Sequence, residues 1–300
     1  MGSDQLGTTK IKWDRIRYGG DSSQFVDLYS PVRSRETEVM DLAQPISPQI
    51  FRAGEVSVLS VERSADFKRT RTAVCFIHGG YWHGESDLSE MEPLVDDLVS
   101  AGIEVANIEY RMMGVGGGWP SSFFDLAASM DALYLSGISR VVLVGHSLGG
   151  QLALWLASVS ARFNSNSGNL RDGGSVVIAG VVTLAGITDL ISFADRGLSG
   201  GVIRIFLGGM PEEVPRRYVA TSPLELLPLR IPALVVHGKK DSIVPIDMSR
   251  KFVQTAKAKG DSIETIEIDD EGHFDLLDPK AHSWGLARHW IRSVCNKRSA

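Results

Sequence analysis

Short apolar runs alternate with longer amphipathic runs along most of the chain, beginning near residue 55. The apolar runs are rich in β-branched residues and stay apolar at consecutive positions, which is typical of strands buried on both faces of a parallel sheet. They predict strands over residues 72–77, 103–108, 140–144, 176–184, 233–237 and 262–268. The amphipathic runs predict helices over residues 88–100, 121–135, 149–163, 246–258 and 279–295. This alternation indicates an α/β protein with a mostly parallel, twisted sheet and helices on both faces.

The N-terminal region, up to about residue 70, does not follow this alternation. Residues 24–29 and 55–61 have the pattern of antiparallel edge strands, which brings the expected sheet to about eight strands. Residues 33–48 between them have the composition of a loop or mobile insert. We therefore expect an antiparallel edge region in front of the parallel core.

A second interruption covers residues 187–230, where we expect short helices that form a small cap over the site. The chain has 300 residues, enough to bury one large core, and it contains no repeat of the length found in solenoids. We expect residues 1–300 to form a single domain.

Charge and cysteine content exclude several classes of partner. The formal net charge is −5 and no run of five or six like charges occurs, so neither nucleic acid nor an anionic membrane is an expected partner. The two cysteines, Cys75 and Cys295, are far apart and indicate neither a disulfide framework nor a metal site. No signal-like or membrane-spanning apolar run occurs, so we expect a cytoplasmic protein, either a monomer or a homodimer.

Cofactor motifs are also missing from the sequence. The glycine-rich residues 114–118 do not match the G-x-G-x-x-G spacing of dinucleotide-binding loops, and Trp119-Pro120 follows them directly. No H-E-x-x-H pattern and no cluster of histidines and cysteines suggests a metal. We expect no cofactor and no metal.

The strongest chemical signal is the pentapeptide Gly145-His146-Ser147-Leu148-Gly149, which follows a predicted strand and opens a predicted helix. A serine on such a tight turn is exposed for attack, and side chains at the two glycines would collide with the adjacent strand and helix. The alternative is a serine that merely caps the helix. The strand before it and the helix after it favour Ser147 as a nucleophile.

A serine hydroxyl needs a base and an orienting carboxylate, expected later in the chain in the order Ser, Asp, His. Asp241 follows a predicted strand through a short turn, and His273 lies after the last predicted strand. The other six histidines compete for the role of the base. Two lie in turns, one ends a strand, one is expected to line the cleft and two lie on the last predicted helix; in this order they are His78 and His146, His237, His83, and His282 and His289. Competing carboxylates, for which a solvated surface charge is the simpler interpretation, are Asp247, Asp269, Asp270 and Asp275.

The segment from His78 to Trp82 lies at the carboxyl end of an early predicted strand. An oxyanion formed beside the serine needs fixed N–H donors, and the expected donors are the backbone N–H groups of Gly80, Tyr81 and Leu148. The alternative is a glycine turn that carries two packing aromatic residues.

Aromatic residues near these segments are candidates for the wall of a substrate pocket. Most aromatic residues of the chain are expected in the core, because large apolar side chains are usually buried. Trp82 and Trp119 are our candidates for substrate binding.

Four motifs together resemble the esterase/lipase branch of the α/β-hydrolase superfamily: His78-Gly79-Gly80-Tyr81-Trp82, Asn107-Ile108-Glu109-Tyr110-Arg111, Gly145-His146-Ser147-Leu148-Gly149-Gly150 and Gly272-His273-Phe274. Within this branch the chain is most similar to kynurenine formamidase (arylformamidase)-like hydrolases and related carboxylesterases. It departs from hormone-sensitive-lipase-type esterases at Tyr81, where they carry a third glycine, and at His146, where they usually carry an acidic residue. The resemblance implies the α/β-hydrolase fold.

Motifs and resemblance together predict a serine hydrolase that cleaves a small carboxylic ester or an aryl formamide through an acyl-enzyme. Ser147 would be the nucleophile, His273 the general base and Asp241 the residue that orients the histidine. An exopeptidase or lactone hydrolase on the same fold, and a binding protein that keeps the fold without the chemistry, remain as alternatives.

Overall fold

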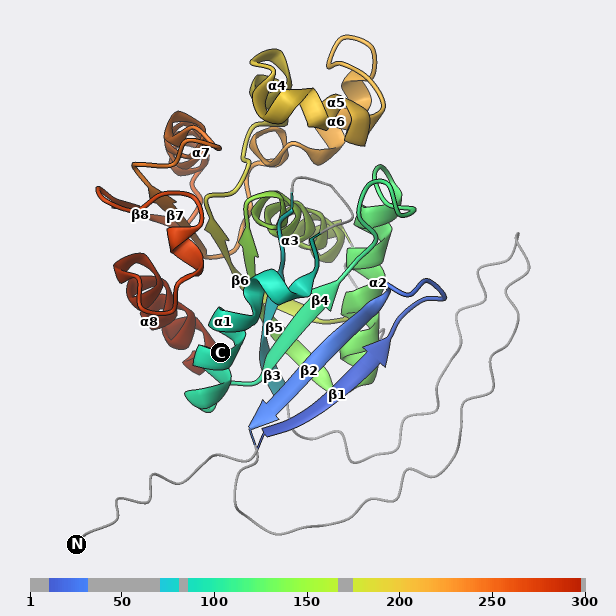
Figure 1. Cartoon of the computed structure of the whole chain (residues 1–300), viewed down its shortest axis with the longest axis vertical. Helices are drawn as coiled ribbons and strands as arrows, with labels where there is room; N and C mark the ends of the chain where they lie inside the picture. The colour runs from blue at the N-terminus through green and yellow to red at the C-terminus, as the bar shows by residue number, and fades with distance from the viewer. Residues whose placement is uncertain (1–10, 32–70, 81–85, 167–174, 298–300) are drawn as a thin grey trace, which may run out of the picture.

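An eight-stranded sheet forms the centre of the computed structural model, which describes residues 11–31, 71–80, 86–166 and 175–297 (Figure 1). The strand order is β1-β2-β4-β3-β5-β6-β7-β8. The strands are β1 (Ile11–Arg17), β2 (Phe25–Pro31), β3 (Arg71–Ile77), β4 (Val105–Glu109), β5 (Ile138–His146), β6 (Val177–Leu184), β7 (Ala233–Gly238) and β8 (Ile263–Ile268). β1 pairs with β2, and β2 with β4, in antiparallel fashion, whereas every pair from β4 to β8 is parallel.

Helices connect the strands of the parallel part. The α-helices are α1 (Glu92–Ser100), α2 (Ser121–Leu135), α3 (Leu148–Asn166), α4 (Leu190–Asp195), α5 (Val202–Leu207), α6 (Pro215–Thr221), α7 (Ile246–Ala258) and α8 (His282–Asn296). Short 3-10 helices are η1 (Leu88–Met91), η2 (Leu198–Gly201), η3 (Pro223–Leu226) and η4 (Asp275–Leu277). Among the residues that the structure describes, no helix is long and apolar enough to cross a membrane.

Successive residues of the central strands pack into two different cores. Val74, Val142 and Val182 belong to the core that α1 and α8 cover on one face, whereas their neighbours Cys75 and Leu143 belong to the core under α2, α3 and α7. Both faces of the sheet are therefore covered, which explains why these strands are apolar at consecutive positions.

All six predicted core strands and all five predicted helices are present, and two helices, α2 and α7, have the predicted bounds. The strand predicted from residue 103 begins at Val105, because the Ile103 N–H closes the end of α1 by donating to the Leu98 carbonyl. The last helix begins at His282 rather than at residue 279. A turn held by Asp278, whose carbonyl accepts the Ala281 N–H, precedes it.

The edge of the sheet was predicted only in part. The strand expected at residues 24–29 is confirmed as β2, but β1 was not predicted. Most of the β1 side chains from Trp13 to Arg17 are exposed, so that strand lacks the apolar pattern of a buried one. The strand expected at residues 55–61 and the insert expected at residues 33–48 lie outside the described residues.

Between β6 and β7 the chain forms α4, η2, α5, α6 and η3, which we call the cap segment (residues 187–230). Figure 1 shows α4, α5 and α6 grouped at one end of the molecule, above α3. Gln151 and Trp155 of α3 donate side-chain hydrogen bonds to the carbonyls of Thr221 and Ala220, at 2.9 and 3.2 Å. The expected short helices are present, and α6, the last α-helix of the cap segment, is hydrogen-bonded to α3.

Candidate active site

Ser147 occupies the turn between β5 and α3 with a φ of +52°, in the left-handed region that non-glycine residues rarely adopt. Its N–H donates to the Leu184 carbonyl of the neighbouring strand at 2.9 Å, and its own carbonyl accepts from the Gln151 N–H at 3.2 Å. The residue is buried but remains 8% exposed. A strained serine held between a strand and a helix is the arrangement of a nucleophile elbow.

The two glycines that flank the elbow allow the tight packing expected from the sequence. A Cβ at Gly149 would lie 2.0 Å from the Ile77 carbonyl oxygen of β3. A Cβ at Gly145 would lie 2.0 Å from the Gly149 carbonyl oxygen. Neither position leaves room for a side chain: glycine at 149 allows α3 to approach β3, and glycine at 145 allows the end of β5 to approach the first turn of α3.

Asp241 and His273 are in direct contact, although 32 positions separate them in the chain. The Nδ1 atom of His273 lies 2.7 Å from Oδ2 of Asp241. The other carboxylate oxygen, Oδ1, accepts the backbone N–H groups of Ile243 and Val244 at 2.8 and 2.9 Å. These bonds fix the carboxylate in the turn after β7, so it can orient the imidazole.

A second histidine supports the same carboxylate. The Nε2 atom of His237 lies 3.2 Å from Oδ2 of Asp241 and 2.9 Å from the Val244 carbonyl, while its Nδ1 atom is 2.8 Å from Ser249 Oγ. Burial raises the pKa of Asp241, but the hydrogen bonds from His237 and His273 outweigh burial and hold this pKa well below 3.8. Asp241 is therefore ionised at neutral pH.

His273 is buried, and burial lowers its pKa below the ordinary value of 6.5, although the hydrogen bond to Asp241 opposes this shift. With Nδ1–H donated to Asp241, Nε2 carries the free lone pair at neutral pH. The imidazole is thus in the protonation state that a general base requires.

We expect the pH dependence of kcat/KM to follow this lowered pKa. Only neutral His273 can accept a proton, so kcat/KM at pH 6.5 should exceed half of its plateau value and should fall as the pH drops through the pKa of His273 in the folded protein, which lies below 6.5. A profile of kcat/KM between pH 4.5 and 9, with protein integrity checked at each pH, measures this limb. An acid limb centred above pH 6.5 would contradict the assignment.

The imidazole of His273 lies beside the elbow. His146 directly precedes Ser147, and its ring centroid is 4.6 Å from that of His273. The Nε2 atom of His146 is also 3.0 Å from the His273 carbonyl oxygen. The structure thus brings the segments of Ser147, Asp241 and His273 to the same edge of the sheet.

The competing carboxylates have other partners or face solvent. Asp247 pairs with Arg196, Asp269 with Lys239, and Asp275 accepts the Gly272 N–H. Asp270 is exposed, as are His282 and His289 on α8. His83 lies outside the described residues.

Residues 78–80, where the sequence predicts oxyanion donors and which we therefore call the oxyanion loop, directly adjoin the elbow. A Cβ at Gly79 would be 3.2 Å from the Ser147 Cβ, and Gly80 has a φ of +108°. Leu148 is the first residue of α3, so its N–H has no acceptor within the helix. The structure thus places Gly79 beside Ser147 and Leu148 directly after it, whereas Tyr81 and Trp82 lie outside the described residues.

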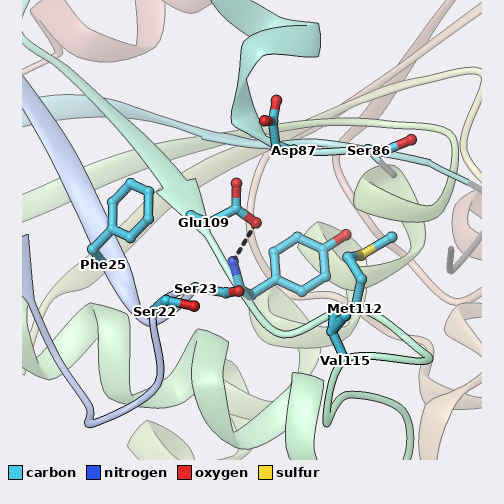
Figure 2. Close-up of a pocket in the computed structure, with 9 residues that line it drawn as sticks. Ser22, Ser23, Phe25, Ser86, Asp87, Glu109, Met112 and Val115 are labelled. Atoms are coloured by element: carbon cyan, nitrogen blue, oxygen red, sulfur yellow. Dashed lines mark hydrogen bonds between the residues drawn. The ribbon is translucent and has the colours of Figure 1, made fainter. Parts of the chain in front are cut away.

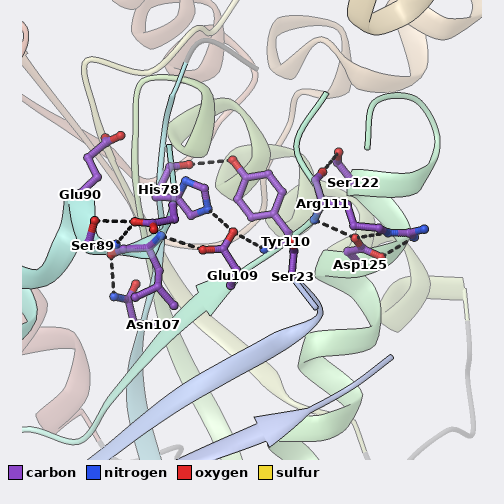
Figure 3. Close-up of polar contacts among 12 residues, drawn as sticks. Ser23, His78, Ser89, Glu90, Asn107, Glu109, Tyr110, Arg111, Ser122 and Asp125 are labelled. Atoms are coloured by element: carbon purple, nitrogen blue, oxygen red, sulfur yellow. Dashed lines mark hydrogen bonds and ion pairs between the residues drawn. The ribbon is translucent and has the colours of Figure 1, made fainter. Parts of the chain in front are cut away.

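A buried network of polar groups holds His78, the first residue of the oxyanion loop, by hydrogen bonds (Figure 3). His78 Nε2 is 3.1 Å from Glu109 Oε1, and the Tyr110 hydroxyl donates to the His78 carbonyl at 2.8 Å. The Glu109 carboxylate also accepts the backbone N–H groups of Leu88 and Tyr110. Burial raises the pKa of the Tyr110 hydroxyl, so it remains a donor.

The ring of His78 also determines how the next peptide is oriented. Its Nδ1 atom lies 3.0 Å from the Gly79 carbonyl oxygen. Because C=O and N–H point in opposite directions across a trans peptide, this contact turns the Gly80 N–H away from the His78 ring. The network therefore defines the direction of one expected oxyanion donor.

A small open cavity of about 210 Å³ lies next to the oxyanion loop (Figure 2). Its lining includes Ser86 and Met112, the two residues that a Cβ at Gly80 would meet. Glu109 and Tyr110 line it from the end of β4. Within the described residues, no group of three or more histidine, cysteine or acidic side chains could hold a metal ion.

Trp119, a candidate for substrate binding, packs in an aromatic cluster below the cap segment. Its ring meets Phe123 edge-on at 5.3 Å, and Phe123 also contacts Trp155 and Phe206. The Trp119 N–H donates to the Phe206 carbonyl at 3.1 Å. These contacts join α2, α3 and α5. Trp119 therefore helps to hold α5 of the cap segment against α2.

Several residues of the site were not predicted as such. Glu90 contacts His146, Glu109 contacts His78, and His237 supports Asp241. His237 had a signal, because a polar residue ends an otherwise apolar strand four positions before Asp241. Glu90 lies in an ordinary amphipathic run, and nothing in the sequence marks it.

Comparisons with known proteins point to esterases. The family model described as BD-FAE matches residues 59–255. Esterase LipC of Mycobacterium tuberculosis is 25% identical over 251 aligned residues, which cover 76% of this chain and 61% of LipC. A probable isoprenylcysteine alpha-carbonyl methylesterase of Arabidopsis thaliana, ICMEL1, is 27% identical over 221 residues, which cover 69% of this chain and 46% of that protein. The chain thus spans about half to three fifths of these relatives.

A solved structure of similar size has the same fold. A truncated form of a carbohydrate esterase from gut microbiota superposes with a TM-score of 0.70, covering 99% of both chains at 18% sequence identity. The mostly parallel eight-stranded sheet with its helices matches this esterase structure. The α/β-hydrolase fold predicted from the sequence is confirmed.

Proposed function

Because the chain belongs to the BD-FAE family, we propose that it is a serine esterase that cleaves small carboxylic esters or aryl formamides through an acyl-enzyme intermediate. The observation that carries the proposal is the 2.7 Å contact between His273 Nδ1 and Asp241 Oδ2, next to a strained serine elbow. An ionised carboxylate, a neutral imidazole and a serine hydroxyl in this order are the parts that nucleophilic acyl transfer requires.

In the first half of the reaction, Ser147 Oγ attacks the carbonyl carbon while His273 Nε2 takes the hydroxyl proton. The oxyanion that forms is held by the N–H groups of Gly80, Tyr81 and Leu148. His273 then protonates the leaving alcohol or arylamine, and the acyl group stays on Ser147. Water attacks the acyl-enzyme with His273 again as base, which releases the acid and restores the hydroxyl.

Asp241 acts on His273 rather than on the substrate. Its Oδ2 atom accepts the Nδ1–H, which keeps the proton-accepting lone pair on Nε2. When His273 becomes charged, the neighbouring carboxylate stabilises the imidazolium. Asp241 keeps its own charge through the cycle, because the bonds from Ile243, Val244 and His237 all favour the carboxylate.

The proposed preference for small acyl groups rests on how the cap segment joins α3. Gln151 and Trp155 follow Ser147 along this helix and are both hydrogen-bonded to the cap segment. The ring of Phe123 packs against Trp155 at 4.7 Å. A long acyl chain running along α3 would have to displace these side chains, which costs on the order of 1–3 kcal/mol.

A panel of p-nitrophenyl acetate, butyrate and octanoate together with N-formylkynurenine tests the substrate class. We expect kcat/KM to fall by at least about tenfold from acetate to octanoate, equivalent to about 1.4 kcal/mol of lost transition-state binding. Turnover of N-formylkynurenine would identify the formamide within the proposed class, and its absence would restrict the class to esters. A preference for octanoate would contradict the small acyl site.

If the protein cleaves no substrate of the panel, fluorophosphonate labelling of Ser147 distinguishes the remaining alternatives. If a fluorophosphonate labels Ser147 but no ester or formamide is cleaved, an exopeptidase or lactone hydrolase activity replaces the proposal. If Ser147 is not labelled either, the chain is a binding protein with the hydrolase fold.

A further inference from the structure

We propose that Glu90 and His146 form a positioning pair that fixes the loop of His273 against the oxyanion loop. The inference rests on the proposed esterase function, because it assigns these two residues to the alignment of that site. Neither residue needs to touch the substrate. Their effect would be exerted through His273 on one side and through Gly79 on the other.

Glu90 provides the contact to the oxyanion loop. It lies in η1, and its Oε1 atom accepts the Gly79 N–H at 3.3 Å. The same oxygen lies 2.5 Å from Nδ1 of His146, in the elbow. One carboxylate oxygen therefore joins the backbone of the oxyanion loop to the residue before Ser147.

His146 provides the contact to the base. Its ring is only 1% exposed, and its Nε2 atom lies 3.0 Å from the carbonyl oxygen of His273. The ring of Phe274, the next residue, packs against the same imidazole at a centroid distance of 5.9 Å. The loop that carries the base is thus held through its backbone, which leaves the His273 side chain free to bond Asp241.

The hydrogen-bond partners of His146 hold its ring at both nitrogens. A backbone carbonyl can only accept, so Nε2 donates to the His273 carbonyl. Nδ1 faces Glu90, whose pKa burial raises but the hydrogen bond with His146 and the charge of His146 lower below its ordinary value of 4.5. The ring is therefore fixed between Glu90 on one side and the backbone of the His273 loop on the other.

His146 also bears on the protonation of the base. Burial lowers the pKa of His273, the charges of His146 and His237 lower it further, and Asp241 raises it.

Two other titratable groups lie near Glu90. His78, which follows β3, lowers the pKa of Glu90, and Glu90 in turn raises the pKa of Tyr110. Through His146, the pair therefore helps to keep His273 unprotonated.

The variant Glu90→Gln separates charge from contact. Because one oxygen of Glu90 faces both the Gly79 N–H and Nδ1 of His146, the amide oxygen can take its place and accept from both, but without the negative charge that strengthens these contacts. We expect kcat at pH 8 to fall, but by less than in His146→Ala. The acid limb of kcat/KM should move to higher pH, because the carboxylate that favours the charged form of His146 is gone, and that charge lowers the pKa of His273.

The variant His146→Ala removes the contact itself. Without the ring, the His273 loop and the elbow are no longer joined, and misplacement of a reacting group by about 1 Å can cost about a hundredfold in rate. We expect kcat to fall by about ten- to a hundredfold at every pH, with KM little changed. The matched controls are Glu92→Gln and His289→Gln, both at exposed positions, which should leave both parameters and the acid limb as in the wild type.

The proposal is overturned if the acid limb of Glu90→Gln superposes on that of Glu92→Gln, or if His146→Ala keeps the wild-type kcat. A measurement independent of turnover is the ¹H–¹⁵N spectrum of the histidine side chains at pH 7. The ring ¹⁵N shifts of His146 should change in Glu90→Gln and stay as in the wild type in Glu92→Gln, because only the first variant alters the group that faces Nδ1; unchanged shifts in Glu90→Gln also overturn the pair. If the wild type cleaves no substrate, the proposed function fails, and the spectrum still decides this inference.

Discussion

Ser147→Ala is expected to lower kcat by at least about a thousandfold on any substrate that the wild type cleaves. Alanine lacks the hydroxyl that attacks the carbonyl, and what remains is substrate binding and oxyanion stabilisation without an acyl-enzyme. The fold should be retained, because alanine is small and is no more strained than serine at a φ of +52°. A loss of this size together with an unchanged melting temperature would assign the chemistry to this hydroxyl.

The matched control is Ser158→Ala, on the same helix. Ser158 is buried and its hydroxyl donates to the Leu154 carbonyl within α3, so its removal tests the loss of a buried serine away from the elbow. This control should retain kcat within about twofold, as expected for a change that does not touch the reacting atoms. Fluorophosphonate labelling followed by peptide mapping should modify Ser147 in both the wild type and the control. More than a tenth of wild-type activity in Ser147→Ala would refute the assignment.

Asp241→Asn is expected to lower kcat by about ten-thousandfold. The asparagine oxygen can still accept the N–H groups of Ile243 and Val244, so its amide nitrogen is placed where Oδ2 was. That nitrogen donates to Nδ1 of His273 and so moves the ring proton to Nε2, where it blocks acceptance of the serine proton. The variant also loses the charge that stabilises the imidazolium.

Asp247→Asn is the control for this variant, because Asp247 is 66% exposed and pairs with Arg196 at the surface. Surface ion pairs contribute about 0–1 kcal/mol, so its kcat and stability should match the wild type. kcat should be measured at pH 7 and again at pH 9 or above. Activity of Asp241→Asn within tenfold of the wild type at pH 7 would exclude the proposed role for this carboxylate.

The parts of the site that could be predicted share a local signature. Ser147 is recognised because its glycine neighbours and its place between a strand and a helix are all contiguous in the chain. Asp241 and His273 follow predicted strands, and the carboxyl ends of parallel strands meet at one edge of a sheet. Sequence reasoning could therefore place all three at that edge, and the structure brings Asp241 and His273 into contact there.

Residues that support these groups have no such signature. Glu90 lies in an amphipathic run and Glu109 at a strand end, as many surface acidic residues do. Each joins the site only through its contact with a histidine from another segment. Strand β1 was missed for a related reason. Its side chains are mostly exposed, so only its backbone pairing with β2 marks it as a strand.

By itself, the sequence determined the alternation of strands and helices, the elbow with its glycines and the order of serine, aspartate and histidine. These depend on contacts between near neighbours and on the burial of each strand. Only the tertiary structure decided that His237 shares Asp241 with His273, and that Glu90 and His146 join the two loops beside Ser147. Such contacts join side chains from distant segments, and their geometry is set by how the sheet, the helices and the loops pack together.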